Sequence, residues 1–280
     1  MRVPSTDGVE LTVHDLGGDG PPLLLCHATG FHGKVWTPMA EYLSSRFRLW
    51  SLDFRGHGMS TSPVGRGFAW EGFGDDVLAV VDALGLDHLA GIGHSKGGTA
   101  LLLAEQARPG TFTSLVLYEP IVFPPDLGPP GGRGDDNPLA AGAERRREVF
   151  PSKEAAYQHY AAKPPLSVLA REALRAYVDH GFEPLGDGTV RLRCRGADEA
   201  QVYRMGGSHG AWDGLPGVSC PTTVATGGTG GTISPEVGAR LAARLGAARL
   251  EVFDELGHFG PLEDPGRVAR SVVAALTVAP

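Results

Sequence analysis

The five residues Gly93-His94-Ser95-Lys96-Gly97 have the pattern Gly-X-Ser-X-Gly. An apolar run at 88–92 precedes them and a helix-forming run at 99–108 follows them, which indicates a strand, a sharp turn and a helix. Such a turn admits only small residues beside the serine, and it lifts the hydroxyl toward the N-terminus of the next helix. The segment therefore predicts that Ser95 is a nucleophile.

A serine hydroxyl is a weak nucleophile at neutral pH and needs a base to accept its proton. The best candidate is His258, in the segment 256–261, between an apolar run at 249–253 and the last helix-forming run. Nine other histidines compete with it. We expect His94 to pack beneath the turn rather than to take part in chemistry.

Composition narrows the class of protein. The chain has 280 residues, 42% of them hydrophobic, and a net charge of −7, which suits one large α/β domain with an insertion. The acidic balance argues against nucleic-acid binding, and the absence of a run of about 20 apolar residues argues against a membrane span.

The cysteines and small motifs point the same way. Cys26, Cys194 and Cys220 are widely spaced, and no apolar signal segment follows Arg2, so we expect a cytoplasmic protein without disulfides. No metal-ligand spacing is evident. The glycine-rich segment 227–231 is not a phosphate-binding loop, because it lacks the required lysine. We therefore expect no metal, no cofactor and a small-molecule substrate, and leave open whether the chain forms a homo-oligomer.

Strand and helix patterns alternate along most of the chain. Strands are expected at 9–16, 23–26, 47–52, 88–92, 114–118, 222–226 and 249–253. Helices are expected at 36–45, 74–84, 99–108, 235–245 and 265–276. This order predicts a mostly parallel sheet with helices on both faces.

The alternation breaks after Glu119-Pro120. A segment rich in proline and glycine, 121–138, is followed by helical patterns at 139–149, 153–163, 166–180 and 199–205. The piece 189–194 could be a strand or a loop, and we expect the arginines at 145–147 to lie on a solvated helix face. The chain is thus divided into a core, 1–120 and 213–280, and a mostly helical cap, 121–212.

The order and spacing of several motifs resemble the α/β-hydrolase family of esterases, lipases and haloperoxidase-like enzymes over nearly the whole chain. These motifs are His27-Ala28-Thr29-Gly30, Trp36, Asp53-Phe54-Arg55-Gly56-His57-Gly58, Gly93 to Gly98, and Gly257-His258-Phe259. The resemblance implies an eight-stranded, mostly parallel sheet with a helical cap after the sixth strand. It also implies that His258 is the catalytic base.

The acid of the expected triad departs from the family pattern. In most relatives an Asp lies in the loop after the seventh core strand, but here that loop, 227–234, has no carboxylate. Glu119 is our replacement, because it ends the sixth strand at the edge where Ser95 is expected and some relatives place their acid there. Asp254 or Glu255 could serve instead, and the third possibility is that no acid is present.

The tetrahedral intermediate of acyl transfer needs backbone N–H donors. We expect these from Lys96, which follows the nucleophile, and from Thr29, in the family's oxyanion loop. The Lys96 amine could reach solvent or an acidic cap residue, and we expect it to have no catalytic role. His27 is expected to brace the oxyanion loop, and Asp53 and Arg55 to hold loops together.

The substrate pocket is predicted more loosely, from Phe31, Trp36, His209 and Trp212. These aromatic residues would suit a small to medium apolar compound. The leading interpretation is a serine hydrolase that cleaves a carboxylic ester, thioester or lactone through an acyl-enzyme. Two alternatives remain: C–C hydrolysis, perhydrolysis or lyase and cyclase chemistry on the same fold, and a ligand-binding protein without catalysis.

Overall fold

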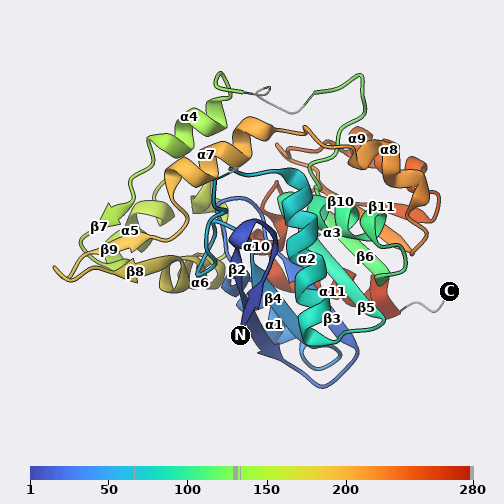
Figure 1. Cartoon of the computed structure of the whole chain (residues 1–280), viewed down its shortest axis with the longest axis horizontal. Coiled ribbons are helices and arrows are strands. Elements are labelled where there is room, and N and C mark those ends of the chain that lie inside the picture. Colours follow the sequence, from blue (N-terminus) through green and yellow to red (C-terminus); the bar gives the residue numbers. More distant parts are fainter. Residues whose placement is uncertain (66, 129–131, 133, 278–280) are drawn as a thin grey trace.

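A mixed eight-stranded sheet forms the centre of the computed structural model, which describes residues 1–65, 67–128, 132 and 134–277 (Figure 1). The strand order is β1-β2-β4-β3-β5-β6-β10-β11. The strands are β1 (Arg2–Pro4), β2 (Glu10–Gly17), β3 (Pro22–Cys26), β4 (Arg48–Asp53), β5 (Leu89–His94), β6 (Phe112–Tyr118), β10 (Thr222–Gly227) and β11 (Ala248–Phe253). Only the β1–β2 and β2–β4 pairs are antiparallel, which confirms the predicted sheet.

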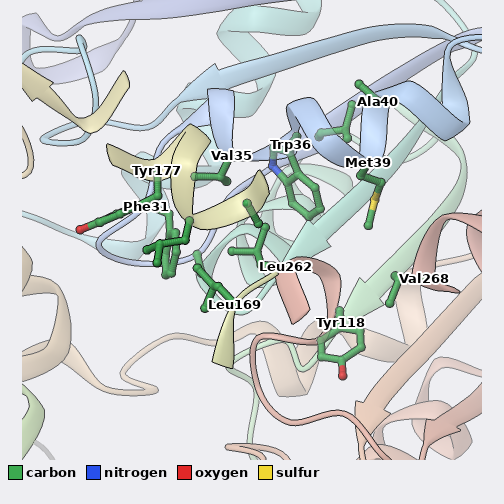
Figure 2. Close-up of a cluster of buried hydrophobic side chains, with 14 of the residues drawn as sticks. Phe31, Val35, Trp36, Met39, Ala40, Tyr118, Leu169, Tyr177, Leu262 and Val268 are labelled. Carbon is green, nitrogen blue, oxygen red and sulfur yellow. The ribbon is translucent and has the colours of Figure 1, made fainter. Parts of the chain in front are cut away.

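Alternate residues of the buried strands face opposite sides of the sheet, and helices cover both. Leu23 and Leu25 of β3 belong to one apolar cluster and Leu24 to the other. The first cluster includes side chains of α1 (Thr37–Leu43) and α11 (Pro265–Thr277), and Figure 2 shows part of it around Trp36. The second includes side chains of α2 (Trp70–Leu84), α3 (Lys96–Ala107) and α9 (Pro235–Leu245).

A cap follows β6 and lies beyond one end of the sheet (Figure 1). Its helices are α4 (Pro138–Glu144), α5 (Lys153–Ala161), η3 (Leu166–Val168), α6 (Arg171–Gly181) and α7 (Gly196–Met205). Part of the preceding proline- and glycine-rich segment, 129–131 and 133, lies outside the described residues. The cap boundaries at 121 and 212 remain a prediction.

The cap also contains a small antiparallel sheet of order β7-β9-β8, formed by β7 (Val149–Phe150), β8 (Phe182–Pro184) and β9 (Val190–Leu192). It settles the open choice for 189–194 in favour of a strand. The helix expected at 139–149 is shorter in the structure, where α4 ends at Glu144. Among the described residues, no helix is long and apolar enough to cross a membrane.

Buried charges tie the loops at the base of the cap to the core. Asp53 accepts hydrogen bonds from the Gly33 amide at 2.7 Å and from His14 Nε2 at 3.0 Å. The fully buried Arg55 donates to Asp76 through Nε at 3.0 Å and Nη2 at 2.8 Å. These contacts agree with the expectation that Asp53 and Arg55 have a structural role and hold loops together.

Candidate active site

The serine motif forms the turn between β5 and α3. Ser95 has φ 55° and ψ −119°, a strained conformation for a non-glycine residue. A Cβ at Gly97 would lie 2.2 Å from the Cys26 carbonyl oxygen, and one at Gly93 would lie 2.5 Å from the Gly98 Cα. Close backbone packing therefore requires both glycines, and it holds Ser95 in the wall of a cavity.

The loop after β11 carries His258 and is held at several points. The Tyr118 hydroxyl donates to the Gly257 carbonyl at 2.8 Å, and the Gly257 amide donates to Glu263 at 2.9 Å. His94 Nε2 lies 2.8 Å from the His258 carbonyl oxygen. Burial lowers the pKa of His94 well below its ordinary value, so His94 is neutral, and its buried ring packs against His258 and Phe259.

Glu119 directly follows β6, and its carboxylate reaches the candidate base. Glu119 Oε2 lies 2.7 Å from His258 Nδ1. The loop that lacks its own carboxylate surrounds Glu119 with amides: Gly227 donates to Oε1 at 2.9 Å, and Thr232 and Ile233 donate to Oε2 at 2.7 and 3.1 Å. The loop thus holds an acid that comes from the neighbouring strand.

The surroundings of Glu119 favour its ionised form. Burial by itself would raise the pKa of this carboxyl, but the hydrogen bond and charge of His258, with the amides of Gly227 and Ile233, hold the pKa below its ordinary value. The alternative acids are both exposed. The carboxylate of one of them, Glu255, lies 2.8 Å from Arg267.

The Lys96 side chain differs from expectation. Its amine is fully buried, 4.3 Å from the Phe54 ring and 4.5 Å from the Phe73 ring. It has no hydrogen-bond partner among the described residues, so the expectation of solvent or an acidic cap residue was wrong. Burial lowers the pKa of the amine to about 7. The backbone amide of Lys96 lies in the first turn of α3, where helix N–H groups favour negative charge.

Replacing Lys96 with methionine is expected to stabilise the fold by a few kcal/mol at pH 7, since each pKa unit corresponds to about 1.4 kcal/mol. The lowered pKa means that folding opposes protonation of the amine. The resulting destabilisation disappears above the pKa of the unfolded chain, about 10.4, grows as the pH falls, and is constant below about 7. Urea unfolding of both proteins between pH 6 and 10.5 measures the difference. A gain no larger than that of Lys34→Met would contradict this account.

Ser95 and His258 line one chamber of about 290 Å³, which we call the catalytic chamber. A second space of about 350 Å³, the distal chamber, extends under the cap and is lined by Arg146, Tyr160 and Glu199. The two chambers share wall residues, which are Thr29, Leu139, Pro165, Tyr203 and Phe259. The distal chamber therefore adjoins the catalytic chamber at these residues.

The segment 27–30, which was predicted to supply an oxyanion donor, borders both chambers. Thr29 lies in both walls. His27 Nδ1 lies 2.7 Å from the Ala28 carbonyl oxygen, and His27 Nε2 accepts from the Phe54 amide at 3.1 Å. Burial lowers the pKa of His27 well below its ordinary value, so a neutral imidazole braces the loop.

Of the four expected pocket residues, the structure places Phe31 in the distal chamber and the other three outside both described chambers. Trp36 is buried in the core between α1 and the sheet (Figure 2). His209 lies behind the catalytic chamber, with Nε2 2.6 Å from the Ile121 carbonyl oxygen. The Trp212 ring lies 5.2 Å from the Arg244 guanidinium carbon. Aromatic character alone therefore did not distinguish cavity walls from core.

The distal chamber contains residues that sequence reasoning missed. Arg146 was expected on a solvated helix face, but its side chain is only 17% exposed and its Nη1 lies 2.6 Å from Glu199 Oε2. Its Nη2 also donates to the Tyr177 hydroxyl. Arg146 lies beyond the end of α4 at Glu144, so its side chain does not follow the helix face that the sequence pattern predicted. No group of three or more histidine, cysteine or acidic side chains suited to a metal ion occurs among the described residues.

A strained serine at the end of a central parallel strand, with a histidine in the same chamber wall and a cap above, defines a hydrolase built on an α/β sheet. Residues 23–271 match the model of the alpha/beta hydrolase family, and the chain belongs to this family. The predicted fold and the predicted hydrolase class are thereby confirmed.

Among curated proteins, the chain is 27% identical over 187 residues to 2-(acetamidomethylene)succinate hydrolase of Mesorhizobium japonicum, covering 67% of this chain but only 63% of that relative. It is 26% identical to N-formylmaleamate deformylase of Pseudomonas putida, over 93% and 90% of the two chains. The crystal structure of E-2-(acetamidomethylene)succinate hydrolase superposes with a TM-score of 0.82 at 23% identity, covering 99% and 98%. This structural likeness supports the fold.

Proposed function

We propose that this hydrolase cleaves a small ester, thioester, lactone or activated amide through an acyl-enzyme on Ser95. His258 accepts the proton of the attacking hydroxyl and later activates water, and Glu119 orients His258. The backbone amides of Lys96 and Thr29 stabilise the oxyanion. The reaction requires no cofactor.

The observation that carries this proposal is the 2.7 Å contact between Glu119 Oε2 and His258 Nδ1. A carboxylate on Nδ1 fixes the imidazole tautomer in which Nε2 can accept a proton, and it stabilises the imidazolium that forms. The loop without a carboxylate therefore does not argue against a complete triad, since an acid from β6 fills its place.

Activated amides join the proposal because of the relatives. The names of the two curated relatives describe N-acyl compounds, an acetamide and a formamide. The chemistry on the serine is the same for an ester and for an amide with a good leaving group, and only the leaving atom differs. C–C hydrolysis, perhydrolysis and lyase or cyclase reactions remain alternatives with the same serine and histidine.

A fluorophosphonate probe followed by a substrate panel tests the proposal. We expect the probe to label the chain once, at Ser95, and peptide mapping to locate the label. Release of acid from an ester or N-acyl substrate would support acyl transfer. Cleavage of a C–C bond with no turnover of esters or amides would favour the alternative chemistry.

Gly231 supplies a test of the acid that leaves every proposed triad residue intact. A Cβ at Gly231 would lie 2.2 Å from Glu119 Oε1, so Gly231→Ala must shift either the carboxylate or the loop whose amides hold it. We expect kcat/KM to fall by about 10- to 100-fold, as misplacement by about 1 Å commonly does. Gly217→Ala, with open space at its Cβ, is the control. Equal kcat/KM in both variants would show that the Glu119 position is unimportant.

A further inference from the structure

Side chains that donate hydrogen bonds outnumber the acceptors in the distal chamber. Its charged lining residues are Arg146, Lys163 and Glu199. Burial and nearby cations lower the pKa of His159, which also lines the chamber, so we count its imidazole as neutral. One arginine and one lysine against one glutamate leave a net charge of +1, in a chain whose net charge is −7.

Arg146 retains the capacity to bind a further acceptor. Its described contacts are one N–H to Glu199 and one to the Tyr177 hydroxyl. A guanidinium has five N–H donors in a planar fork that matches a carboxylate. The side chain is mostly buried but still lines the chamber, so a substrate group can reach its remaining donors.

Tyr160 forms part of the chamber wall beside Arg146. The residue is 8% exposed and lines the chamber, and its ring centroid lies 5.5 Å from the Arg146 guanidinium carbon. Its hydroxyl oxygen is enclosed by protein and has no partner among the described residues. The hydroxyl therefore does not face the chamber, and Arg146 carries the argument for a ligand.

The chamber also meets the oxyanion loop. At Gly30, which has φ +81°, an added Cβ would lie 2.5 Å from Glu199 Oε1 and 3.5 Å from Arg146 Nη1. Gly30 follows Thr29, which lies in the walls of both chambers. A group held by Arg146 therefore lies close to the wall that the distal chamber shares with the catalytic chamber.

We infer that the distal chamber binds a carboxylate carried by the substrate, through Arg146, with Lys163 adding positive charge at the exposed side. This inference rests on the proposed function, because it assigns part of that substrate. A carboxylate fits better than a phosphate, since one negative charge neutralises the chamber and a phosphate monoester carries nearly two.

Two matched pairs of esters test the inference in both substrate orientations. The first pair is 4-nitrophenyl hydrogen adipate and its neutral 6-amide, and the second is 4-acetoxybenzoate and 4-acetoxybenzamide. We expect the wild-type kcat/KM to favour the acid at least tenfold in one pair. Equal rates in both pairs, or a preference for the amides, would overturn the inference.

Variants assign the preference to residues. Glu199→Gln removes the competing carboxylate and should raise the ratio of acid to amide kcat/KM. Adding Arg146→Gln to Glu199→Gln should lower that ratio at least tenfold, without leaving a buried carboxylate unpaired. Tyr160→Phe, which removes an enclosed hydroxyl beside Arg146, is the control and should leave the ratio unchanged. An unchanged ratio in the double variant would refute the assignment.

Binding separates this inference from the proposed function. Calorimetry should show adipate binding to the wild-type protein more tightly than neutral adipamide, and more weakly to the double variant, whether or not catalysis occurs. Probe labelling at Ser95 without adipate binding would overturn the carboxylate inference and leave the serine hydrolase standing. Adipate binding without labelling would do the opposite.

Discussion

Replacing Ser95 with alanine is expected to lower kcat by about 10⁴-fold or more. The change removes the atom that attacks the carbonyl and leaves the strained turn, the chamber and the oxyanion donors in place. Residual turnover would come from those remaining groups. Steady-state hydrolysis of an activated ester, combined with loss of fluorophosphonate labelling, measures the effect.

The matched control for that experiment is Ser167→Ala, an exposed serine of the cap segment η3. Its kcat should equal that of the wild-type protein. An alanine at Ser95 could also relieve or increase backbone strain at φ 55°, so thermal unfolding should be measured in parallel. A Ser95→Ala protein that is folded and hydrolyses the ester within tenfold of the wild-type rate would rule out the proposed nucleophile.

The second large effect is expected from Glu119→Gln, which should lower kcat by about 10²- to 10⁴-fold. The variant keeps the shape of the side chain but removes the charge that stabilises the imidazolium. It also leaves one of the two terminal atoms unable to accept from the amides of Gly227, Thr232 and Ile233. The pH–rate profile of kcat/KM, measured beside the wild type, reports the change.

The same variant gives a signed prediction for stability. Because the folded-state pKa of Glu119 lies below its ordinary value, its carboxylate stabilises the fold fully at pH values above the unfolded pKa of about 4.3. That stabilisation is lost as the pH falls through the folded-state pKa. The free-energy difference between wild type and Glu119→Gln, from urea unfolding, should therefore be largest near neutrality and shrink in acid.

Glu255→Gln is the control for Glu119→Gln, since Glu255 is exposed and paired with Arg267. It should leave both kcat and stability near the wild-type values. If Glu119→Gln keeps kcat within threefold of the wild type while Glu255→Gln or Asp254→Asn lowers it, the acid comes from the loop before His258 and the proposal for Glu119 fails.

The elements that position the site could be predicted from sequence because their signals are local. A continuous apolar run, two glycines and a helix-forming run specify the turn at Ser95, and the sheet follows from regular alternation. Glu119 was found by topology, since adjacent parallel strands end at the same edge of a sheet. Its proximity to His258 could be anticipated, but the ring of amides around it could not.

The cap was predicted less well because its polar residues obtain their positions from packing. Ala140 and Ala143 mark the buried face of α4, and continuing that spacing would turn Arg147 inward rather than Arg146. The helix ends first, and no local feature of three consecutive arginines reveals which one is buried. Lys96 was misjudged similarly, since a lysine is rarely buried without a charged partner.

Ser95 and Glu119 follow neighbouring strands that pair directly, β5 and β6, and the Ser95 amide donates to the Tyr118 carbonyl at 2.8 Å. His258 instead follows β11, one of the two edge strands of the sheet. If this edge strand unfolded locally, the imidazole of His258 would move away from the hydroxyl of Ser95 and the carboxylate of Glu119, which would stay together. On heating, this enzyme should thus lose activity reversibly through local unfolding at the edge of the sheet, before the central strands unfold.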